Sequence, residues 1–281
     1  MKYGVAIFPT DYSIHPFALG QALEERGFES LWVAEHSHIP VSRRTPWPGG
    51  AELPKMYYDA MDPFVTLATA GAATKRLRLA TGICLVVQRD PIQLAKEVAS
   101  LDVVTGGRFL FGVGGGWNEE EMQNHGTQLA GRWKLLRERI EAMKEIWTKK
   151  QAEYHGEHVS FDPIFAWPKP VQKPHPPIHV GGAYPGGMRR AIRYGDGWIP
   201  ILGRGEDPAK LVPNFRKEAA AAGRDPDTLE LSIYGCPAQK ELVTRLRDAG
   251  VSRVVFFVPS AKEDVVLPAL DGQAELAGAV G

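Results

Sequence analysis

The chain has no excess of charge, no paired cysteines and no long apolar run. Lys plus Arg and Asp plus Glu both number 33 in 281 residues, so nothing indicates a nucleic-acid or membrane partner. Cys84 and Cys236 form no C-x-x-C pair, which favours buried free thiols in a reducing compartment. No apolar stretch approaches the roughly 20 residues that span a bilayer. We therefore expect a cytoplasmic protein.

Short runs rich in Val, Ile, Leu and Phe alternate with longer stretches that have apolar residues at helical spacing. Nearly continuous apolar runs are typical of parallel strands covered on both faces. Glycines such as Gly27 and Gly250 lie at the predicted helix ends, just before the next strand. The predicted strands are residues 2–8, 29–35, 77–86, 109–113, 178–182, 197–201, 229–235 and 253–258.

Eight such units predict an α/β fold, a (β/α)8 TIM barrel that forms a single domain over residues 1–281 with an insertion before strand 5. A doubly wound open sheet is the alternative, but that fold usually has fewer strands. In the fourth helix, an apolar stripe spaced 3, 4, 3, 4 is interpreted as core rather than as a cofactor site. Its members are Trp133, Leu136, Ile140, Met143 and Trp147.

Two segments exceed what a minimal barrel needs, namely residues 37–61 and 151–177, and both are rich in proline. Long irregular loops in compact domains are usually functional or disordered. The first follows strand 2, at the carboxyl face where barrels carry their active sites, so we predict a substrate lid. The second precedes strand 5 and is predicted to form a hairpin over the same face.

Glycines gather at the carboxyl ends of strands 4 and 5. The run Gly181-Gly182-Ala183, with Gly187 at the start of the next helix, would let the backbone approach a phosphate that the helix N-terminus holds. Arg189 and Arg190 could assist, and the alternative is a tight turn without a ligand. The run 114–116 would leave room for a flat ring, or would form a bulge.

His36 and His38 form an H-x-H pair at the end of strand 2, a spacing that metal ligands also use. His179 on strand 5 is a possible third ligand. Strands 6 and 8 end without histidine or acidic residues, so a metal-dependent hydrolase is the weaker interpretation and we assign no metal ligand.

Taken together, several segments resemble the bacterial luciferase-like superfamily, and more closely its branch that uses the deazaflavin coenzyme F420. The resemblance extends from strand 1 to about residue 220, while the last 60 residues carry no motif. The segments that carry it are Glu35-His36, residues 91–102, 106–108, 112–117, Arg132, Glu138, residues 177–182 and residues 194–198.

This resemblance implies a cofactor ring in the barrel mouth, backed by a non-proline cis peptide at Gly82-Ile83, and a hydride transfer between coenzyme F420 and a small organic substrate. His36 would lie near the reacting ring carbon, either as a catalytic residue that exchanges a proton or only as a hydrogen-bond partner of the cofactor. The residues implied in cofactor binding are His36, Gly82, Ile83, Gly114, Gly116, Asn118, Gly181, Gly182, Ala183 and Gly187.

Two departures bear on the choice of substrate and cofactor. Sugar-phosphate dehydrogenases of this family have an acidic residue after the strand-4 glycines, where this chain has Trp117. FMN-dependent monooxygenases have a tyrosine near the start of the fourth helix, where this chain has Trp133. We expect F420 rather than FMN, with an FMN-dependent monooxygenase and a non-catalytic flavin- or deazaflavin-binding protein as alternatives. The family resemblance also suggests a homodimer.

Overall fold

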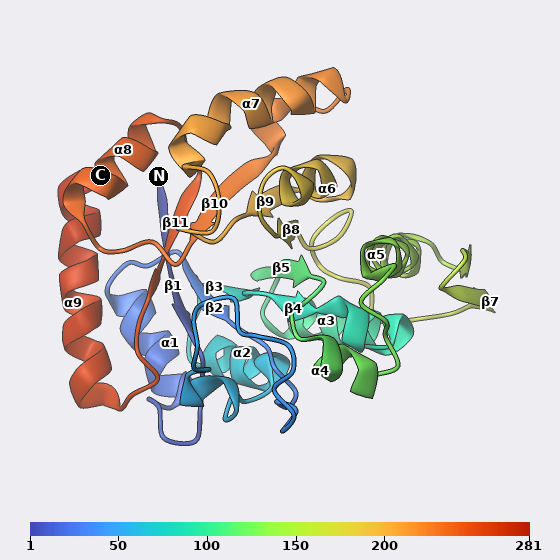
Figure 1. The fold of residues 1–281 in the computed structure, drawn as a ribbon, viewed down its shortest axis with the longest axis horizontal. Helices are drawn as coiled ribbons and strands as arrows, with labels where there is room; N and C mark the ends of the chain where they lie inside the picture. Colours follow the sequence, from blue (N-terminus) through green and yellow to red (C-terminus); the bar gives the residue numbers. More distant parts are fainter.

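The computed structural model describes residues 1–281 and shows a closed parallel barrel surrounded by helices (Figure 1). The strands follow the order β3-β2-β1-β11-β10-β9-β8-β5-β4, and pairing between β3 and β5 closes the sheet. All eight predicted strands are present, and the third of them is divided into two short strands, β3 and β4. The barrel strands are β1 (Lys2–Ile7), β2 (Ser30–Val33), β3 (Arg78–Thr81), β4 (Cys84–Leu85), β5 (Phe109–Gly114), β8 (Ile178–Gly181), β9 (Gly197–Ile199), β10 (Glu230–Tyr234) and β11 (Arg253–Phe257).

Helices connect the strands, and three of them begin in the same way. Asp62, Asp90 and Asp207 each precede a proline and accept hydrogen bonds from backbone N–H groups of the first turn. None of the helices is both long and apolar enough to cross a membrane. The helices are α1 (Pro16–Glu25), α2 (Pro63–Ala72), α3 (Pro91–Val104), α4 (Glu119–Asn124), α5 (Arg132–Thr148), α6 (Gly186–Tyr194), α7 (Pro208–Ala221), α8 (Lys240–Asp248) and α9 (Glu263–Val280), with short 3₁₀ turns η1 (Lys55–Tyr57), η2 (Val86–Gln88) and η3 (Pro226–Thr228).

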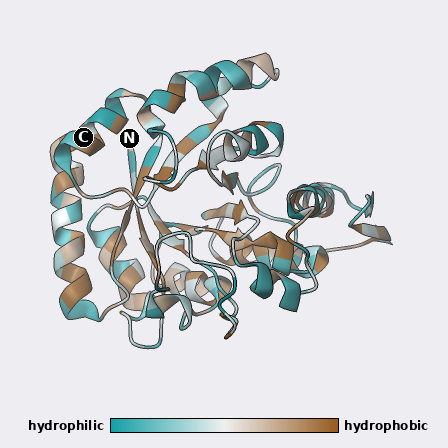
Figure 2. Ribbon diagram, in the orientation of Figure 1, coloured by the Kyte–Doolittle hydropathy of each residue, from teal (hydrophilic) through white to brown (hydrophobic).

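Apolar side chains fill both the barrel and the layer between barrel and helices, and Figure 2 shows the strands as mostly hydrophobic. A cluster of seven buried residues that includes Trp32 and Tyr234 lies apart from the larger core. Both cysteines are buried free thiols, as predicted. Gly27 and Gly250 have φ angles of 77° and 88°, which confirms their role at helix ends.

The third predicted strand is interrupted at the position that the resemblance implies. The peptide bond between Gly82 and Ile83 is cis, and it separates β3 from β4. The Gly82 N–H group still donates to the carbonyl of Val33, so the break remains attached to β2. The chain therefore bulges at the barrel mouth, directly below the pocket described in the next section.

The insertion before β8 is a hairpin, as predicted, but its predicted place over the barrel mouth is wrong. Strands β6 (Ala152–His155) and β7 (Ser160–Ile164) lie on the outer side of α5 (Figure 1). The Glu138 carboxylate of α5 accepts hydrogen bonds from the N–H groups of His158 and Val159, and Tyr154 donates to Glu141. These bonds to buried and half-buried carboxylates hold the hairpin against the helix.

A buried arginine joins the strands at the opposite end of the barrel. The Arg253 guanidinium is fully buried and donates to Glu29 at 2.8 Å, to Glu230 at 2.7 Å and to Ser232 at 2.9 Å. Burial would raise the pKa of Glu230, but the charge of Arg253 outweighs it and lowers that pKa to about 2. The ion pair therefore stabilises the fold fully above the ordinary glutamate pKa, and its contribution is lost as the pH falls toward 2.

Replacing Arg253 with Met should lower the free energy of unfolding by about 3 kcal/mol, because the half-buried carboxylates of Glu29 and Glu230 lose a fully buried common partner. Urea denaturation at pH 7 measures this. Arg26→Met, which removes a more exposed pair with Asp271, is the control and should cost less than about 1 kcal/mol. An equal loss of unfolding free energy in both variants would show that the buried Arg253 cluster stabilises the fold no more than the exposed pair does.

Candidate active site at the mouth of the barrel

A pocket of about 250 Å³ opens at the carboxyl ends of the barrel strands. It has two unlike sides. On β4, β5, β8 and the loops that follow them, the wall is mostly backbone, formed by Ile83, Gly114, Gly115, Gly116, Gly181 and Gly182. On β1, β10 and β11 and in the loop after β2, it consists of large aromatic side chains, namely Phe8, Trp47, Tyr57, Tyr234 and Phe257.

The glycine side admits no larger residue. A Cβ atom on Gly114 would lie 1.8 Å from Cδ1 of Ile83, and one on Gly115 would lie 2.7 Å from the Trp133 ring. A Cβ on Gly82 would meet the Tyr234 ring at 2.8 Å. The wall is thus a close-packed surface of backbone and the Ile83 side chain, which suits a flat ring.

The aromatic side includes part of the predicted lid. Tyr57 lies against Phe8 with ring centroids 4.4 Å apart, and Trp47 meets Tyr57 at 5.6 Å. Both lid residues line the pocket, whereas Tyr58 is 48% exposed and does not. The loop after β2 therefore covers the pocket with apolar surface, in agreement with the prediction for residues 37–61.

His36 lies between the two sides, just after β2. Its Nδ1 is 2.8 Å from Oε2 of Glu121 on α4, and the N–H group of Ser37 donates to the other carboxylate oxygen. Since an ionised carboxylate can only accept, Nδ1 carries a proton and Nε2 stays free. The ring also contacts Tyr57 at 5.3 Å and Trp117 at 5.8 Å. Glu121 thus fixes both the orientation and the tautomer of His36.

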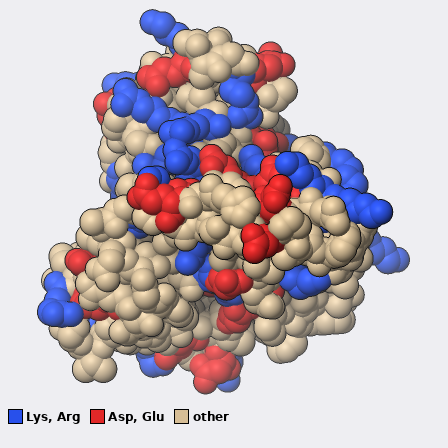
Figure 3. All heavy atoms as spheres, turned by 90° about the vertical axis from the view of Figure 1, so that its right-hand side faces the viewer, with Lys and Arg blue, Asp and Glu red and all other residues tan.

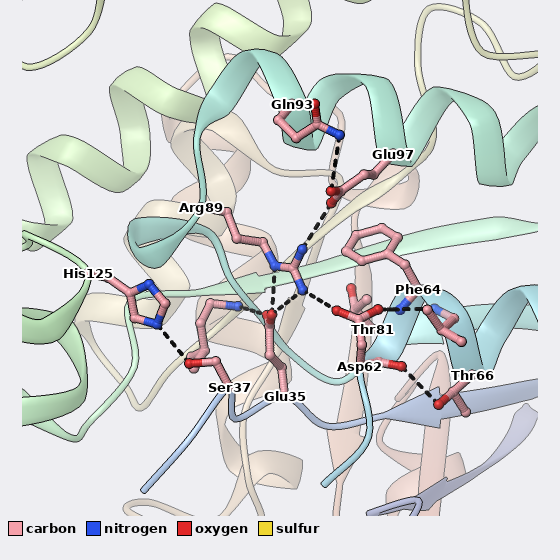
Figure 4. Close-up of polar contacts among 12 residues, drawn as sticks. Glu35, Ser37, Asp62, Phe64, Thr66, Thr81, Arg89, Gln93, Glu97 and His125 are labelled. Carbon is pink, nitrogen blue, oxygen red and sulfur yellow. Dashed lines mark hydrogen bonds and ion pairs between the residues drawn. The ribbon is translucent and has the colours of Figure 1, made fainter. Parts of the chain in front are cut away.

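An ion-pair network fixes the residue before His36 (Figure 4). Buried Glu35 accepts from Nε of Arg89 at 2.6 Å and from the Leu85 N–H group at 2.5 Å. Arg89 in turn donates to Asp62 and Glu97. Burial alone would lower the pKa of Arg89, but Glu35 and the other acceptors raise it above its ordinary value. The network connects the end of β2 with β4, α2 and α3.

The expected phosphate site lies where β8 meets α6. Gly182 has a φ angle of 124°, and a Cβ on Gly187 would lie 2.1 Å from the Gly182 carbonyl oxygen, so both positions need glycine. The N–H group of Gly187 donates to the Ala183 carbonyl at 2.7 Å, so it is not a free donor for a phosphate. Nη2 of Arg190 would be 3.1 Å from a Cβ on Gly182, and this guanidinium has no carboxylate partner.

The interpretation of Trp133 as core holds only in part: the other four members of its stripe are buried, whereas Trp133 packs against the core and also faces the pocket. Trp133 is only partly buried and lines the pocket beside Gly115. The Arg190 guanidinium lies 3.6 Å and that of Arg132 4.5 Å from the centroid of its ring. Helical spacing placed it on the core side, but it stands at the first turn of α5, where the helix reaches the barrel mouth.

The structure brings most of the predicted cofactor residues together. His36, Gly82, Ile83, Gly114, Gly116, Gly181 and Gly182 line the pocket. Asn118, Ala183 and Gly187 do not line it. Asn118 is instead the N-cap of α4, where its side-chain oxygen accepts from the Glu121 N–H group at 3.2 Å. Ala183 and Gly187 lie just outside, at the start of α6.

The third ligand suggested for the H-x-H pair lies elsewhere. His179 is buried inside the barrel, 5.7 Å from the Trp32 ring and 3.5 Å from Glu230. Burial and Arg253 lower its pKa to about 4, so it is neutral at pH 7. His38 faces away from His36 toward Ser37 and Asn124. No group of three or more His, Cys, Asp or Glu side chains is arranged to hold a metal ion.

Of the two site residues that the sequence analysis did not name, Tyr234 and Glu121, only Tyr234 could have been found from the sequence. Tyr234 stands near the carboxyl end of the predicted strand 229–235, where site residues of a barrel are expected. Its hydroxyl is buried without a partner. Glu121 follows the strand-4 glycines by a few residues, but its pairing with His36 over 85 residues of chain has no local signal.

With this geometry described, comparison with known proteins identifies the family. Residues 17–248 match the sequence pattern of the luciferase-like monooxygenases, and the chain belongs to that family. A protein of Mycobacterium tuberculosis named only as uncharacterized is 42% identical over 272 residues, covering 94% of both chains.

Two further proteins carry names that mention F420. The F420-dependent hydroxymycolic acid dehydrogenase of Mycobacterium tuberculosis is 31% identical over 75% of this chain and 55% of its own length. The solved structure of an F420-dependent secondary alcohol dehydrogenase, in complex with an F420-acetone adduct, superimposes with a TM-score of 0.78 over 100% of both chains. At 20% identity, this second likeness shows the shared barrel fold.

Glu120 attaches the lid to α4. Its buried carboxylate accepts from the Ser42 hydroxyl, from the Arg44 N–H group at 2.9 Å, and from the N–H and hydroxyl groups of Thr45 at 2.8 and 2.5 Å. The hydrogen bonds from Ser42 and Thr45 lower the pKa of Glu120 despite its burial. The carboxylate therefore stays charged, and the lid attached, well below pH 4.5.

Glu120→Ala should free the lid and speed tryptic cleavage after Arg43 or Arg44, by about tenfold, because local opening controls access to the protease. Mass spectrometry of the fragments gives the site and the rate. Glu119→Ala is the control, since the Glu119 side chain bonds only Gln123. If both variants are cut at the wild-type rate, Glu120 does not hold the lid.

Proposed function

We propose that the protein is an oxidoreductase that transfers a hydride between coenzyme F420 and a small organic substrate. The observation that carries this proposal is the glycine-walled slot with His36 beside it. Because Gly114, Gly115, Gly181 and Gly182 carry no side chains, this wall of the pocket presents backbone against which the flat deazaflavin ring can lie. The family and the two F420-dependent proteins described above support the same conclusion. When bound, the cofactor accepts or supplies the hydride.

The protein's own residues position the substrate, exclude water and move a proton. Nε2 of His36 is free, so it can take a proton from a substrate hydroxyl or return one to a carbonyl. Glu121 holds the imidazole in place through the 2.8 Å contact with Nδ1. Trp47 and Tyr57 in the lid close the aromatic side, which favours an apolar alcohol or carbonyl compound. Trp117 stands where the sugar-phosphate dehydrogenases of this family have an acidic residue, so we do not expect a sugar phosphate as the substrate.

Two other functions remain as alternatives for the same site. An FMN-dependent monooxygenase would need reduced flavin and molecular oxygen, and the family description includes that activity. A non-catalytic flavin-binding protein would bind the cofactor without turnover. Trp133, stacked with Arg190, takes the place where a tyrosine hydroxyl would reach an FMN phosphate, which favours F420.

Titration of the purified protein with F420 and FMN in parallel, followed by tryptophan fluorescence, tests the cofactor. We expect F420 to bind at least about tenfold more tightly than FMN, since Trp117 and Trp133 line the site and report on it. The reverse preference, with oxygen consumed during turnover, would establish the monooxygenase. Tight F420 binding without turnover on a broad panel of alcohols and ketones would establish the binding protein.

His36→Ala should lower kcat by about 100-fold or more while leaving F420 affinity nearly unchanged, because it removes the proton-exchanging group. Glu121→Gln should lower kcat less, by about tenfold, and change the pH profile of kcat rather than KM, as expected for a positioning residue. Glu119→Gln is the matched control on the same helix. Unchanged kcat in His36→Ala would refute the assigned role.

We also propose that the protein forms a homodimer. Phe165 and Trp167, which follow the hairpin, are 65% and 57% exposed and offer apolar surface for such a contact. Sedimentation velocity measures the state directly: Trp167→Glu should shift a dimer toward monomer, and a monomeric wild type would contradict the proposal.

A further inference from the structure

Four arginines lie on the neighbouring helices α5 and α6, and Arg190 among them stands beside the expected phosphate site. Arg132 and Arg137 come from α5, and Arg190 and Arg193 from α6; we call this group the arginine furrow. The two helices are joined here by Lys144, whose ammonium group donates to the Tyr194 carbonyl at 2.7 Å. In Figure 3, which views this side of the molecule, Lys and Arg side chains gather in the upper half of the surface.

The furrow contains far more positive charge than its own acidic residues can neutralise. Its one ion pair joins Arg137 to Glu141 at 3.6 Å, and Glu141 also accepts from the Tyr154 hydroxyl. Arg132 donates only to the Leu129 carbonyl. Arg190 lies over the Trp133 ring and forms no salt bridge, and Arg193 is exposed on α6, where it lines a surface pocket with Glu218 of α7. Such an excess of guanidinium groups is the usual mark of an anion-binding surface.

Buried polar atoms without partners point the same way. The Nε atoms of Arg132, Arg137 and Arg190 are all buried without a hydrogen bond, and so is the hydroxyl of Tyr194. Tyr194 is 6% exposed, and Arg190, Arg137 and Arg193 all lie near enough to act on it electrostatically. A polyanion that contacts the outer nitrogen atoms of these guanidinium groups would neutralise charge that the protein leaves largely unpaired.

The furrow begins at the pocket and leads away from it. The Arg190 side chain lies between Gly182 and Trp133. Its Nη2 would be 3.1 Å from a Cβ on Gly182, and its guanidinium carbon is 3.6 Å from the centroid of the Trp133 ring. Arg193 follows one turn later on α6, and Arg137 lies one turn or more along α5 from Arg132. An anionic chain that leaves the pocket past Gly182 would therefore meet Arg190 first, and then Arg137 and Arg193.

We propose that the arginine furrow binds the oligoglutamate tail that extends from the phosphodiester of coenzyme F420. This inference rests on the proposed cofactor. The tail carries a series of carboxylates, whereas FMN ends at its phosphate, so the furrow would contribute to the choice between them. Arg190 would contact the phosphodiester, while Arg137 and Arg193 would bind carboxylates of the tail.

The test compares F420 carrying its glutamate tail with F420-0, the same molecule without glutamates, by tryptophan fluorescence at low and at moderate salt. We expect the tailed form to bind about tenfold more tightly, with a steeper loss of affinity as salt rises. The double variant Arg137→Gln/Arg193→Gln should abolish that difference and keep the affinity for F420-0, which also verifies its fold. Arg26→Gln, on the opposite side of the barrel, is the charge-matched control.

Equal affinity of the wild type for the two forms would overturn the tail site and leave the F420 assignment intact. A double variant that retains the full preference for the tailed form would also overturn it. If neither form binds to the wild type, the proposed cofactor itself fails, and the furrow proposal with it.

Discussion

Two neighbouring carboxylates on the short helix α4 hold the parts of the active site together. Glu121 orients His36, and Glu120 attaches the lid through Ser42 and Thr45. Both side chains are almost completely buried, so a lost partner would leave a buried carboxylate without one of its hydrogen-bond donors. Asn118 begins this helix, and its cap fixes where the two carboxylates point. The residue that exchanges protons and the loop that excludes water thus depend on the same turn of helix.

The barrel could be predicted because the sequence features that specify it are local. Apolar runs of strand length, helical stripes and glycines at helix ends each depend on a few neighbouring residues, and eight repeats leave one common architecture. The glycine wall was also predictable, since runs of glycine at the carboxyl ends of two strands indicate that backbone, rather than side chains, faces the barrel mouth. The place of the 151–177 hairpin was not, because it depends on long-range bonds to Glu138 and Glu141 on a helix surface.

The candidate site was harder to predict wherever two distant segments meet. His36 was identified from its position after β2, but Glu121 and Arg89 join it from elsewhere in the chain without a local pattern. Trp133 was misjudged because periodicity describes which face of a helix a residue lies on, but not how far that helix extends past the core. The H-x-H pair was misleading because β2 ends at Val33, and alternation of side chains does not continue into a loop.

The contrast between the two walls of the pocket has a consequence for how such a protein can diversify. The glycine wall is defined by close contacts, and an added methyl group at Gly114 or Gly115 would displace the side chain of Ile83 or Trp133. The aromatic wall consists of bulky side chains, such as Phe8 and Phe257, that can each be trimmed without touching the other side. New substrate ranges can therefore be reached by single substitutions, while the ring-binding slot stays constant. Directed evolution of this barrel should target its aromatic half.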